Sequence, residues 1–207
     1  MIKDKTPSSS SSPARAFPRQ RLLGGRVVDI DLLGTGDGEA VAGLVQKLPT
    51  HDLLFVRRDL AHPKVMSAWL DALGTGTITS LAARWKGELV GCTAVVTDPH
   101  GWSRHVAELR VIVSPDWRGR GLGRALIQES FAIALGFGLE KLTVQMTVDQ
   151  RAAIAVFEEL GFRAEALLSR HVADRSGTLH DLVLLSHDVA AVEARNDAYG
   201  LTDALGG

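Results

Sequence analysis

Residues 108–124 read ELRVIVSPDWRGRGLGR, and this stretch decides the fold. Its first part, 109–113, is rich in β-branched residues, which predicts a buried or half-buried strand. A Ser-Pro-Asp sequence at 114–116 ends that strand, because proline has no N–H for a sheet ladder and aspartate favours turns. The apolar run at 125–127 begins a helical stripe. The stretch therefore predicts a strand, a turn and a helix in direct succession.

Glycines and arginines fill the turn that precedes the helix. They are Arg118, Gly119, Arg120, Gly121, Gly123 and Arg124. A glycine-rich turn at the start of a helix exposes several backbone N–H groups at the positive end of the helix dipole. Guanidinium groups beside such a turn favour an anionic ligand, most simply a phosphate or pyrophosphate.

Two familiar phosphate motifs do not match this turn. A P-loop ends in Gly-Lys-Ser/Thr, and the chain contains no Gly-Lys pair. A dinucleotide fingerprint reads G-x-G-x-x-G, whereas the third glycine here comes one residue early. The pattern that fits is Arg/Gln-x-x-Gly-x-Gly/Ala, present as Arg118-Gly119-Arg120-Gly121-Leu122-Gly123. This hexapeptide resembles the acyl-coenzyme A motif of the GNAT acetyltransferase superfamily.

A second stretch extends the resemblance. Residues 149–162, DQRAAIAVFEELGF, are similar to the GNAT signature N-x-x-A-x-x-L-Y-x-x-x-G-F. Matches to that signature occur at Ala153, Gly161 and Phe162. Gln150 stands where the family usually has Asn, and Phe157 where it usually has Tyr.

Hydrophobic periodicity predicts further elements around these two blocks. We expect strands at 25–33, 77–85, 88–97, 105–113, 141–147, 164–173 and 179–186, and helices at 39–48, 59–74, 122–135, 153–160 and 190–198. This order fits the α/β (α+β) class. The resemblance implies a GNAT-like mixed, largely antiparallel sheet flanked by helices, in which two central strands splay apart to receive the acyl-CoA.

Composition separates a tail from one domain. Residues 1–20 contain five consecutive serines and three prolines, and such a segment buries too little apolar surface to become ordered. We expect a disordered tail there and a single GNAT-like domain over 21–207. The net charge of −1 argues against a nucleic-acid-binding surface. No apolar run approaches the ~18 residues of a membrane span and no secretory signal is present, so we expect a cytoplasmic enzyme.

Cysteine and histidine usage predicts neither redox nor metal chemistry. Cys92 is the only cysteine and lies among apolar residues, which favours a buried, inert thiol. The seven histidines have no metal-ligand spacing, so we expect no metal.

The resemblance implies an acetyl-CoA site along residues 111–124. Backbone groups of the strand would bind the pantetheine arm, and the N–H groups of the turn would bind the pyrophosphate. Gln150 would contact the pantetheine, or would only cap its helix, and Phe157 would pack beside the pantetheine. The predicted cofactor-binding residues are Val111, Ile112, Val113, Arg118, Gly119, Arg120, Gly121, Leu122, Gly123, Arg124, Gln150 and Phe157.

Glu108 is the predicted general base. An amine is mostly protonated at neutral pH and must lose a proton before it attacks a thioester, and many GNAT enzymes use a Glu on this strand. The alternative is structural, because Arg110 lies two residues on and projects from the same face, where it could form an ion pair. His105, His171 and His180, like Trp69, Trp102 and the turn at Asp174, are candidates for the acceptor pocket.

These residues predict an N-acetyltransferase that moves an acetyl group from acetyl-CoA to an amine by direct attack within a ternary complex. One alternative is a module of the same fold that binds acyl-CoA without catalysis, which the missing Tyr at Phe157 favours. A weaker alternative is a binder of nucleotide phosphates. Dimerisation is common in the superfamily, so the resemblance leaves a homodimer open.

Overall fold

One sheet runs through the described part of the chain, which in this computed structural model comprises residues 16–56 and 58–189. Its strands lie in the order β1-β2-β4-β5-β6-β7-β9-β8, and the short β3 pairs with β5. The strands are β1 (Arg19–Leu23), β2 (Arg26–Leu32), β3 (Ile78–Thr79), β4 (Leu81–Trp85), β5 (Glu88–Thr97), β6 (Val106–Val113), β7 (Lys141–Thr147), β8 (Arg163–Ala173) and β9 (Leu179–Asp188). Every pair in this sheet is antiparallel except β6 with β7.

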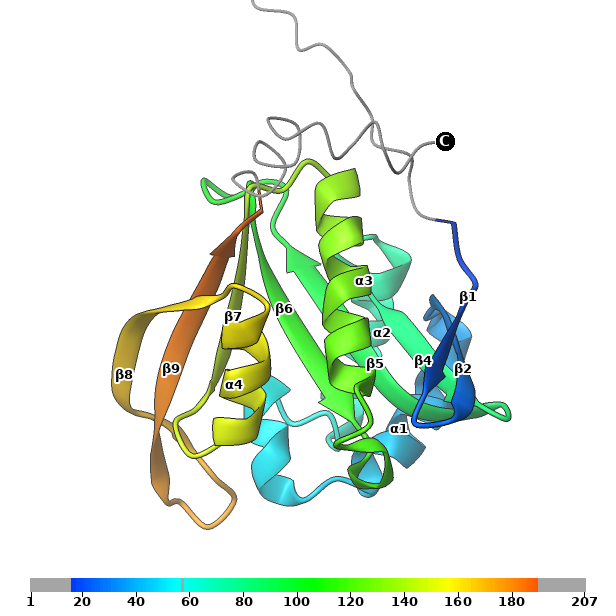
Figure 1. Ribbon diagram of the computed structural model, residues 1–207. Helices are drawn as coiled ribbons and strands as arrows, with labels where there is room; N and C mark the ends of the chain where they lie inside the picture. Colours follow the sequence, from blue (N-terminus) through cyan, green and yellow to red (C-terminus); the bar gives the residue numbers. More distant parts are fainter. Residues whose placement is uncertain (1–15, 57, 190–207) are drawn as a thin grey trace, which may run out of the picture.

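Helices cover both faces of the sheet (Figure 1). The helices are α1 (Gly38–Gln46), α2 (Pro63–Gly74), α3 (Leu122–Gly136) and α4 (Arg151–Glu159), with short 3-10 turns η1 (Thr35–Asp37), η2 (Thr50–Val56) and η3 (Pro115–Trp117). In Figure 1, α3 and α4 lie in front of the sheet, and α1 and α2 lie behind it. The predicted fold class, a mixed and largely antiparallel sheet flanked by helices, is confirmed.

The two central strands, β6 and β7, separate halfway along β6. β6 pairs with β7 only at Val106, Ala107 and Glu108, opposite residues 141–143. Beyond Glu108, β6 continues to pair with β5 as far as Val113 but no longer pairs with β7. The open end of this V lies at the bottom of Figure 1, where η2 contacts both strands. The splayed strands that the resemblance implied are therefore present, and they part at Glu108.

Gly91 shows why α3 can lie so close to the sheet. A Cβ at this position would lie 3.0 Å from the carbonyl oxygen of Ile112 and 3.1 Å from a methyl group of Leu126. Such contacts are too short for a side chain in a close-packed interior. The glycine inside the predicted strand thus marks a close approach between β5 and α3.

The N-terminal boundary differs from the sequence prediction. Arg19 and Gln20, assigned to the tail, pair with Ile30 and Asp29 in β1 and β2. β1 is also tied to α3, because Arg21 donates from Nε to Oε1 of the fully buried Glu129 at 3.1 Å. The partner lies 108 residues away, so no local pattern could reveal this contact. Residues 1–15 and the helix predicted at 190–198 lie outside the described residues.

Smaller differences concern the ends of elements. The helix predicted from residue 59 begins at Pro63, where proline suits the first helical turn and the His62 side chain accepts a hydrogen bond from the Lys64 N–H at 3.2 Å. The single strand predicted at 77–85 is divided into β3 and β4. The β8–β9 hairpin and β7 were predicted nearly to the residue.

Candidate functional site

The backbone of β6 faces the opening at alternate residues. The Ser114 N–H donates to the Val90 carbonyl of β5 at 2.9 Å, whereas the Ala107 carbonyl accepts from the Thr143 hydroxyl of β7 at 3.3 Å. Because backbone groups alternate sides along a strand, those of Val111 and Val113 point toward β7, which has already separated. Those of Ile112 point toward β5. Of the three predicted pantetheine-binding residues, two therefore present backbone groups to the opening.

Two glycines of the turn adopt a left-handed backbone conformation. Gly119 and Gly121 adopt φ angles of 67° and 83°, which favour glycine over residues with a Cβ. Gly121 is the N-cap of α3 and offers no side chain to the first N–H groups of that helix. A Cβ on Gly123 would contact Val113 at 3.8 Å, which shows that the helix start lies against the end of β6. The predicted strand, turn and helix are confirmed.

Aromatic packing from distant segments holds this turn in place. Trp117, in the turn itself, is 3% exposed and packs against Trp85 with ring centroids 5.7 Å apart. The Arg26 guanidinium lies 4.7 Å from the Trp85 ring centroid and 5.4 Å from that of Trp117. Leu23 of β1 lies beside Gly121, where an added Cβ would be 3.8 Å from it. The sequence prediction missed these supports, because they come from β1, β2 and β4.

The three arginines of the turn already have partners. Arg118 forms an ion pair with Asp52 of η2, and Arg124 forms one with Glu159 at the end of α4. Arg120 donates from Nε to the Asp116 carbonyl at 3.1 Å. These pairs tie the turn to η2 and α4, the two segments that flank the opening. An anion bound here would share the guanidinium groups with those carboxylates.

Glu108 lies at the point where β6 and β7 part. Its Oε1 accepts a hydrogen bond from Nε of Arg110 at 2.9 Å, and both side chains are largely buried. The ion pair offered as the structural alternative is thus formed, and the catalytic role stays a prediction. Arg110 and Ile112 line a small cavity with Trp69 of α2, so the even-numbered side chains of β6 face α2.

Two glutamines near the opening carry buried amide atoms without hydrogen-bond partners among the described residues. They are Oε1 of Gln145 and Nε2 of Gln150. Gln150 occupies the N-cap position of α4 but makes no capping hydrogen bond, so the capping interpretation is wrong. Thr143 pairs with Glu108 in parallel register, so their side chains lie on the same face of the sheet. Gln145 lies two residues beyond Thr143, so the Gln145 side chain lies on that face as well. No signal in the sequence singled out Gln145.

Phe157 belongs to the core rather than to the opening. It is 2% exposed and packs edge-on against Phe162 with ring centroids 4.9 Å apart. A ring so completely covered by protein has almost no surface left for a ligand. Its burial argues against the predicted contact with pantetheine.

Two histidines and two carboxylates form a cluster beside η2. Nε2 of His51 lies 2.7 Å from Oδ2 of Asp149, and the ring of His51 meets that of His180 edge-on at 5.1 Å. Nε2 of His180 lies 2.9 Å from Oδ2 of Asp174. A hydrogen bond from the Thr147 hydroxyl, with a smaller contribution from His51, lowers the pKa of Asp149. The cluster joins η2, the start of α4 and the β8–β9 hairpin.

The remaining acceptor candidates are scattered. His180 belongs to the cluster above, but His105 and His171 are exposed strand-end or edge residues. Trp69 is buried in the core. Trp102, which is 97% exposed, lies in the turn between β5 and β6, at the opposite end of β6 from the opening. His51 was missed because a lone histidine in a 3-10 turn carries no motif.

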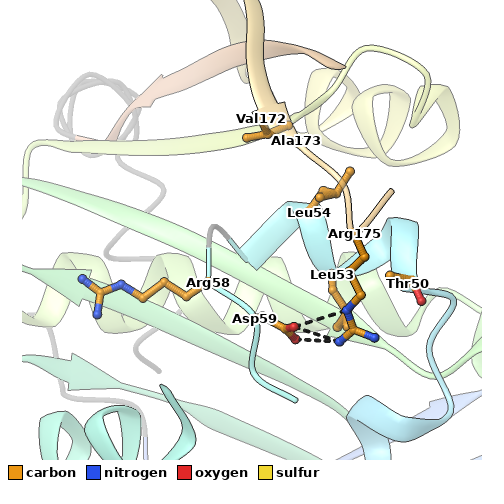
Figure 2. A pocket seen from close by; sticks show the side chains of 8 residues that line it. All are labelled: Thr50, Leu53, Leu54, Arg58, Asp59, Val172, Ala173 and Arg175. Atoms are coloured by element: carbon orange, nitrogen blue, oxygen red, sulfur yellow. Dashed lines mark hydrogen bonds and ion pairs between the residues drawn. The ribbon is translucent and has the colours of Figure 1, made fainter. Parts of the chain in front are cut away.

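A cavity of about 280 Å³ lies between η2 and the β8–β9 hairpin. Leu53, Leu54 and Val172 form its apolar wall, and Asp59 and Arg175 meet across it (Figure 2). Arg175 donates to Asp59 from Nη2 at 2.8 and 3.0 Å and from Nε at 3.3 Å. This cavity opens beside η2, one of the two segments that flank the splayed strands.

The model of the acetyltransferase (GNAT) family matches residues 47–162, more than half of the 207-residue chain. The chain belongs to the GNAT family. The match covers β6, the glycine turn, α3 and both glutamines.

Individual GNAT proteins resemble the chain more distantly. An IAA acetyltransferase of Azospirillum brasilense is 34% identical over 93 residues, which cover 45% of this chain and 60% of that protein. The chain spans less than two thirds of the length of the curated relatives it matches.

Solved GNAT structures share the fold. The ribosomal-protein-alanine N-acetyltransferase of Brucella melitensis superposes with a TM-score of 0.68 at 23% identity, covering 77% of this chain and 98% of that one. The acetyltransferase YncA of Salmonella typhimurium, solved with its cofactor acetyl-CoA, gives 0.67 at 20% identity, covering 78% and 94%.

The residues of this GNAT chain fit acetyl-CoA. The buried amide donor at Gln150 has no acceptor among the described residues, and an unmatched buried donor costs free energy that a ligand carbonyl would recover. Backbone groups of Val111 and Val113 face the opening, and the left-handed glycines leave the start of α3 clear for phosphate.

Other chemistries find less support in the described residues. Within 16–56 and 58–189, no three His, Cys, Asp or Glu side chains gather as a metal site would need. No helix in those ranges is long and apolar enough to cross a membrane. Cys92 is buried, as expected, and its burial raises the pKa of the thiol to about 12.

Proposed function

We propose that the protein is an N-acetyltransferase that transfers an acetyl group from acetyl-CoA to a primary amine by direct attack within a ternary complex. The observation that carries this proposal is the opening between β6 and β7, with Glu108 at its vertex and the glycine turn at its mouth. Two GNAT structures with the same fold are named as an N-acetyltransferase and as an acetyltransferase with acetyl-CoA. When bound, acetyl-CoA would supply the acetyl group as a thioester.

The coenzyme would be held mainly by backbone groups. Val111 and Val113 would hydrogen-bond the pantetheine along the free side of β6, and Gln150 would donate from Nε2 to one of its carbonyl groups. The pyrophosphate would bind the N–H groups at the start of α3, between Gly119 and Arg124. Arg118 and Arg124 would add charge by sharing their guanidinium groups between phosphate and the carboxylates they now contact.

Glu108 would accept the proton that the amine must lose. The ion pair with Arg110 is compatible with this role. Nε of Arg110 binds one carboxylate oxygen of Glu108 and thereby fixes the orientation of the carboxyl group. Gln145, on the same face, would accept a hydrogen bond from a remaining N–H of the amine. The acceptor would enter through the cavity between η2 and the β8–β9 hairpin.

The deciding experiment measures thiol release from acetyl-CoA by the purified protein in the presence of mixed primary amines. We expect release that depends on the amines, with acetylated amine detected by mass spectrometry. Thermal stabilisation by acetyl-CoA without any amine-dependent release would instead support a non-catalytic acyl-CoA-binding module. Equal stabilisation by ATP and by CoA would support a general binder of nucleotide phosphates.

Two broader expectations accompany this proposal. A cytoplasmic location is the expectation from the sequence and is checked by fractionation of cells that express the protein. A homodimer is implied by the family and is checked by light scattering at micromolar concentration.

A further inference from the structure

The cavity beside the opening combines an apolar wall with a surplus of positive charge. Leu53 and Leu54 of η2 and Val172 of β8 form the wall. The charged lining residues are Arg58, Asp59 and Arg175, two cations and one anion. The cavity therefore has one positive charge that its own lining does not balance.

The surplus charge can be assigned to Arg58. Asp59 and Arg175 neutralise one another through two-pronged hydrogen bonding, with three N···O distances between 2.8 and 3.3 Å. Arg58 is exposed and makes no hydrogen bond or ion pair with any residue in the described ranges. Figure 2 shows its side chain extending away from the Asp59–Arg175 pair. A second guanidinium thus stands beside the cavity with its donors available.

The carboxylates near the cavity are engaged by partners outside its lining. Asp52 of η2 pairs with Arg118 of the glycine turn. The carboxylates of the nearby cluster, Asp149 and Asp174, each contact a histidine. An acceptor that enters the cavity would therefore meet a positive lining on its polar side and leucine and valine side chains on the other.

We propose that the acceptor is an amine that also carries a carboxylate beside an apolar side chain, as a free amino acid does. This inference rests on the proposed function and specifies its substrate class. Guanidinium groups bind carboxylates in a planar, two-pronged geometry, which Arg58 offers directly and Arg175 offers by sharing with Asp59. The apolar wall accommodates the side chain of the same molecule.

The same charges disfavour the competing class of acceptors. A simple alkylamine or a polyamine enters as a net cation, which the surplus positive charge repels, whereas a zwitterionic amino acid carries no net charge. Positive charge near an ammonium group also favours its deprotonated form. The lining thus selects the carboxylate-bearing amine and eases the proton transfer that Glu108 would complete.

Matched pairs of acceptors test this inference in the wild-type protein. The pairs are leucine with isopentylamine, phenylalanine with phenethylamine, and leucine with leucinamide. The second member of each pair lacks the carboxylate or carries a neutral amide in its place, and it keeps the apolar side chain. We expect kcat/KM to favour the carboxylate-bearing member by about tenfold or more, the scale of a charge-assisted hydrogen bond. Equal or better rates for the partners without a carboxylate would overturn the inference while leaving the proposed function intact. If no amine of any kind were acetylated, the proposed function would fail instead.

Variants of the cavity residues then show which side chains cause the preference for carboxylate-bearing acceptors. Arg58→Gln and Arg175→Gln should each reduce the leucine-to-isopentylamine ratio of kcat/KM about tenfold. Asp59→Asn should increase that ratio, because it releases Arg175 from its partner. Arg104→Gln, at an exposed arginine in the β5–β6 turn, is the matched control and should leave the ratio unchanged. Thermal unfolding confirms that each variant folds, and a ratio unaffected by both Arg58→Gln and Arg175→Gln would assign the preference elsewhere and overturn the proposal.

Discussion

The proposed coenzyme side and the proposed acceptor side of this molecule are built in opposite ways. The coenzyme side, residues 108–124, is one continuous stretch whose backbone faces the opening and whose supports are buried. The acceptor side joins residues 50–59 to residues 172–180, and its main bond, Asp59 to Arg175, links residues 116 positions apart. Both partners of that bond are about half exposed. In the proposed function, the cosubstrate would be bound by a fixed backbone, whereas the acceptor would be bound by side chains on the surface.

The energetics of the two sides differ for the same reason. Exposed ion pairs contribute little to stability, typically about 0–1 kcal/mol, because water screens them and long side chains lose entropy. The coenzyme side instead rests on Trp117, which is 3% exposed, and on the fully buried Glu129. Substitutions on the acceptor side should therefore change specificity at low cost in stability, and those on the coenzyme side should affect binding or folding.

The largest effect is expected where the two sides meet, at Glu108. Glu108→Gln should lower kcat by roughly 10²–10⁴-fold if Glu108 is the general base, while affinity for acetyl-CoA stays nearly constant. The measurement is turnover at pH 7 with chemistry rate-limiting, together with CoA titration. Glu165→Gln makes the same change at an exposed carboxylate of β8 and should leave turnover unaltered. Wild-type turnover in Glu108→Gln would assign proton transfer to another group.

Gly121→Asp should abolish the binding of acetyl-CoA. Acetyl-CoA at ~100 times its Kd should stabilise the wild type by about 2.7 kcal/mol, measured as a shift in thermal unfolding. Aspartate at the N-cap of α3 adds a side chain and a negative charge beside the phosphates, so this gain should disappear. Gly177→Asp is the matched control, because Gly177 has a similar φ angle of 85° but lies in the β8–β9 turn. Stabilisation that persists in Gly121→Asp would place the coenzyme elsewhere.

Arg21→Gln should show that the coenzyme side depends on a strand outside its motif. The substitution weakens the charge-assisted hydrogen bonding to fully buried Glu129, so the free energy of unfolding should fall by about 2 kcal/mol. Chemical denaturation measures this change. Lys47→Gln breaks the exposed ion pair with Glu88 and should cost less than about 1 kcal/mol. Equal losses in the two variants would mean that burial does not distinguish these pairs.

The sequence predicts the coenzyme side well because its information is local. The positive φ angles at Gly119 and Gly121, the strand before them and the helix after them all follow from neighbouring residues. The family resemblance implied that two central strands splay apart, but only the structure shows that they separate at Glu108. What the sequence could not supply were contacts between distant segments, such as Arg21 with Glu129, or His51 with Asp149. Phe157 shows the converse limit, because its place in the family signature suggested contact with the pantetheine, whereas the structure buries it in the core.

The smallest effect is expected on the acceptor side, at Asp174. Its carboxylate accepts hydrogen bonds from the Ser176 hydroxyl at 2.6 Å, from the N–H groups of Ser176 and Thr178 at 2.9 and 3.0 Å, and from His180 at 2.9 Å. These bonds, that of the Ser176 hydroxyl first, hold the pKa of Asp174 well below its usual range. A depressed folded-state pKa contributes stability above the unfolded-state pKa of about 3.9, and that contribution is lost as pH falls through the lower folded-state pKa.

The carboxyl carbon of Asp174 should therefore show no NMR titration between about pH 6 and pH 3 in the folded protein. In Ser176→Ala its titration should move up toward the ordinary range, because the strongest donor is gone. The effect on global stability should be small, since the group is exposed and screened by water. A wild-type midpoint near the ordinary value of about 3.9 would show that the hairpin is not organised by this carboxylate in solution. The acceptor side would then be looser than its hydrogen bonds suggest, and the contrast with the coenzyme side would be sharper still.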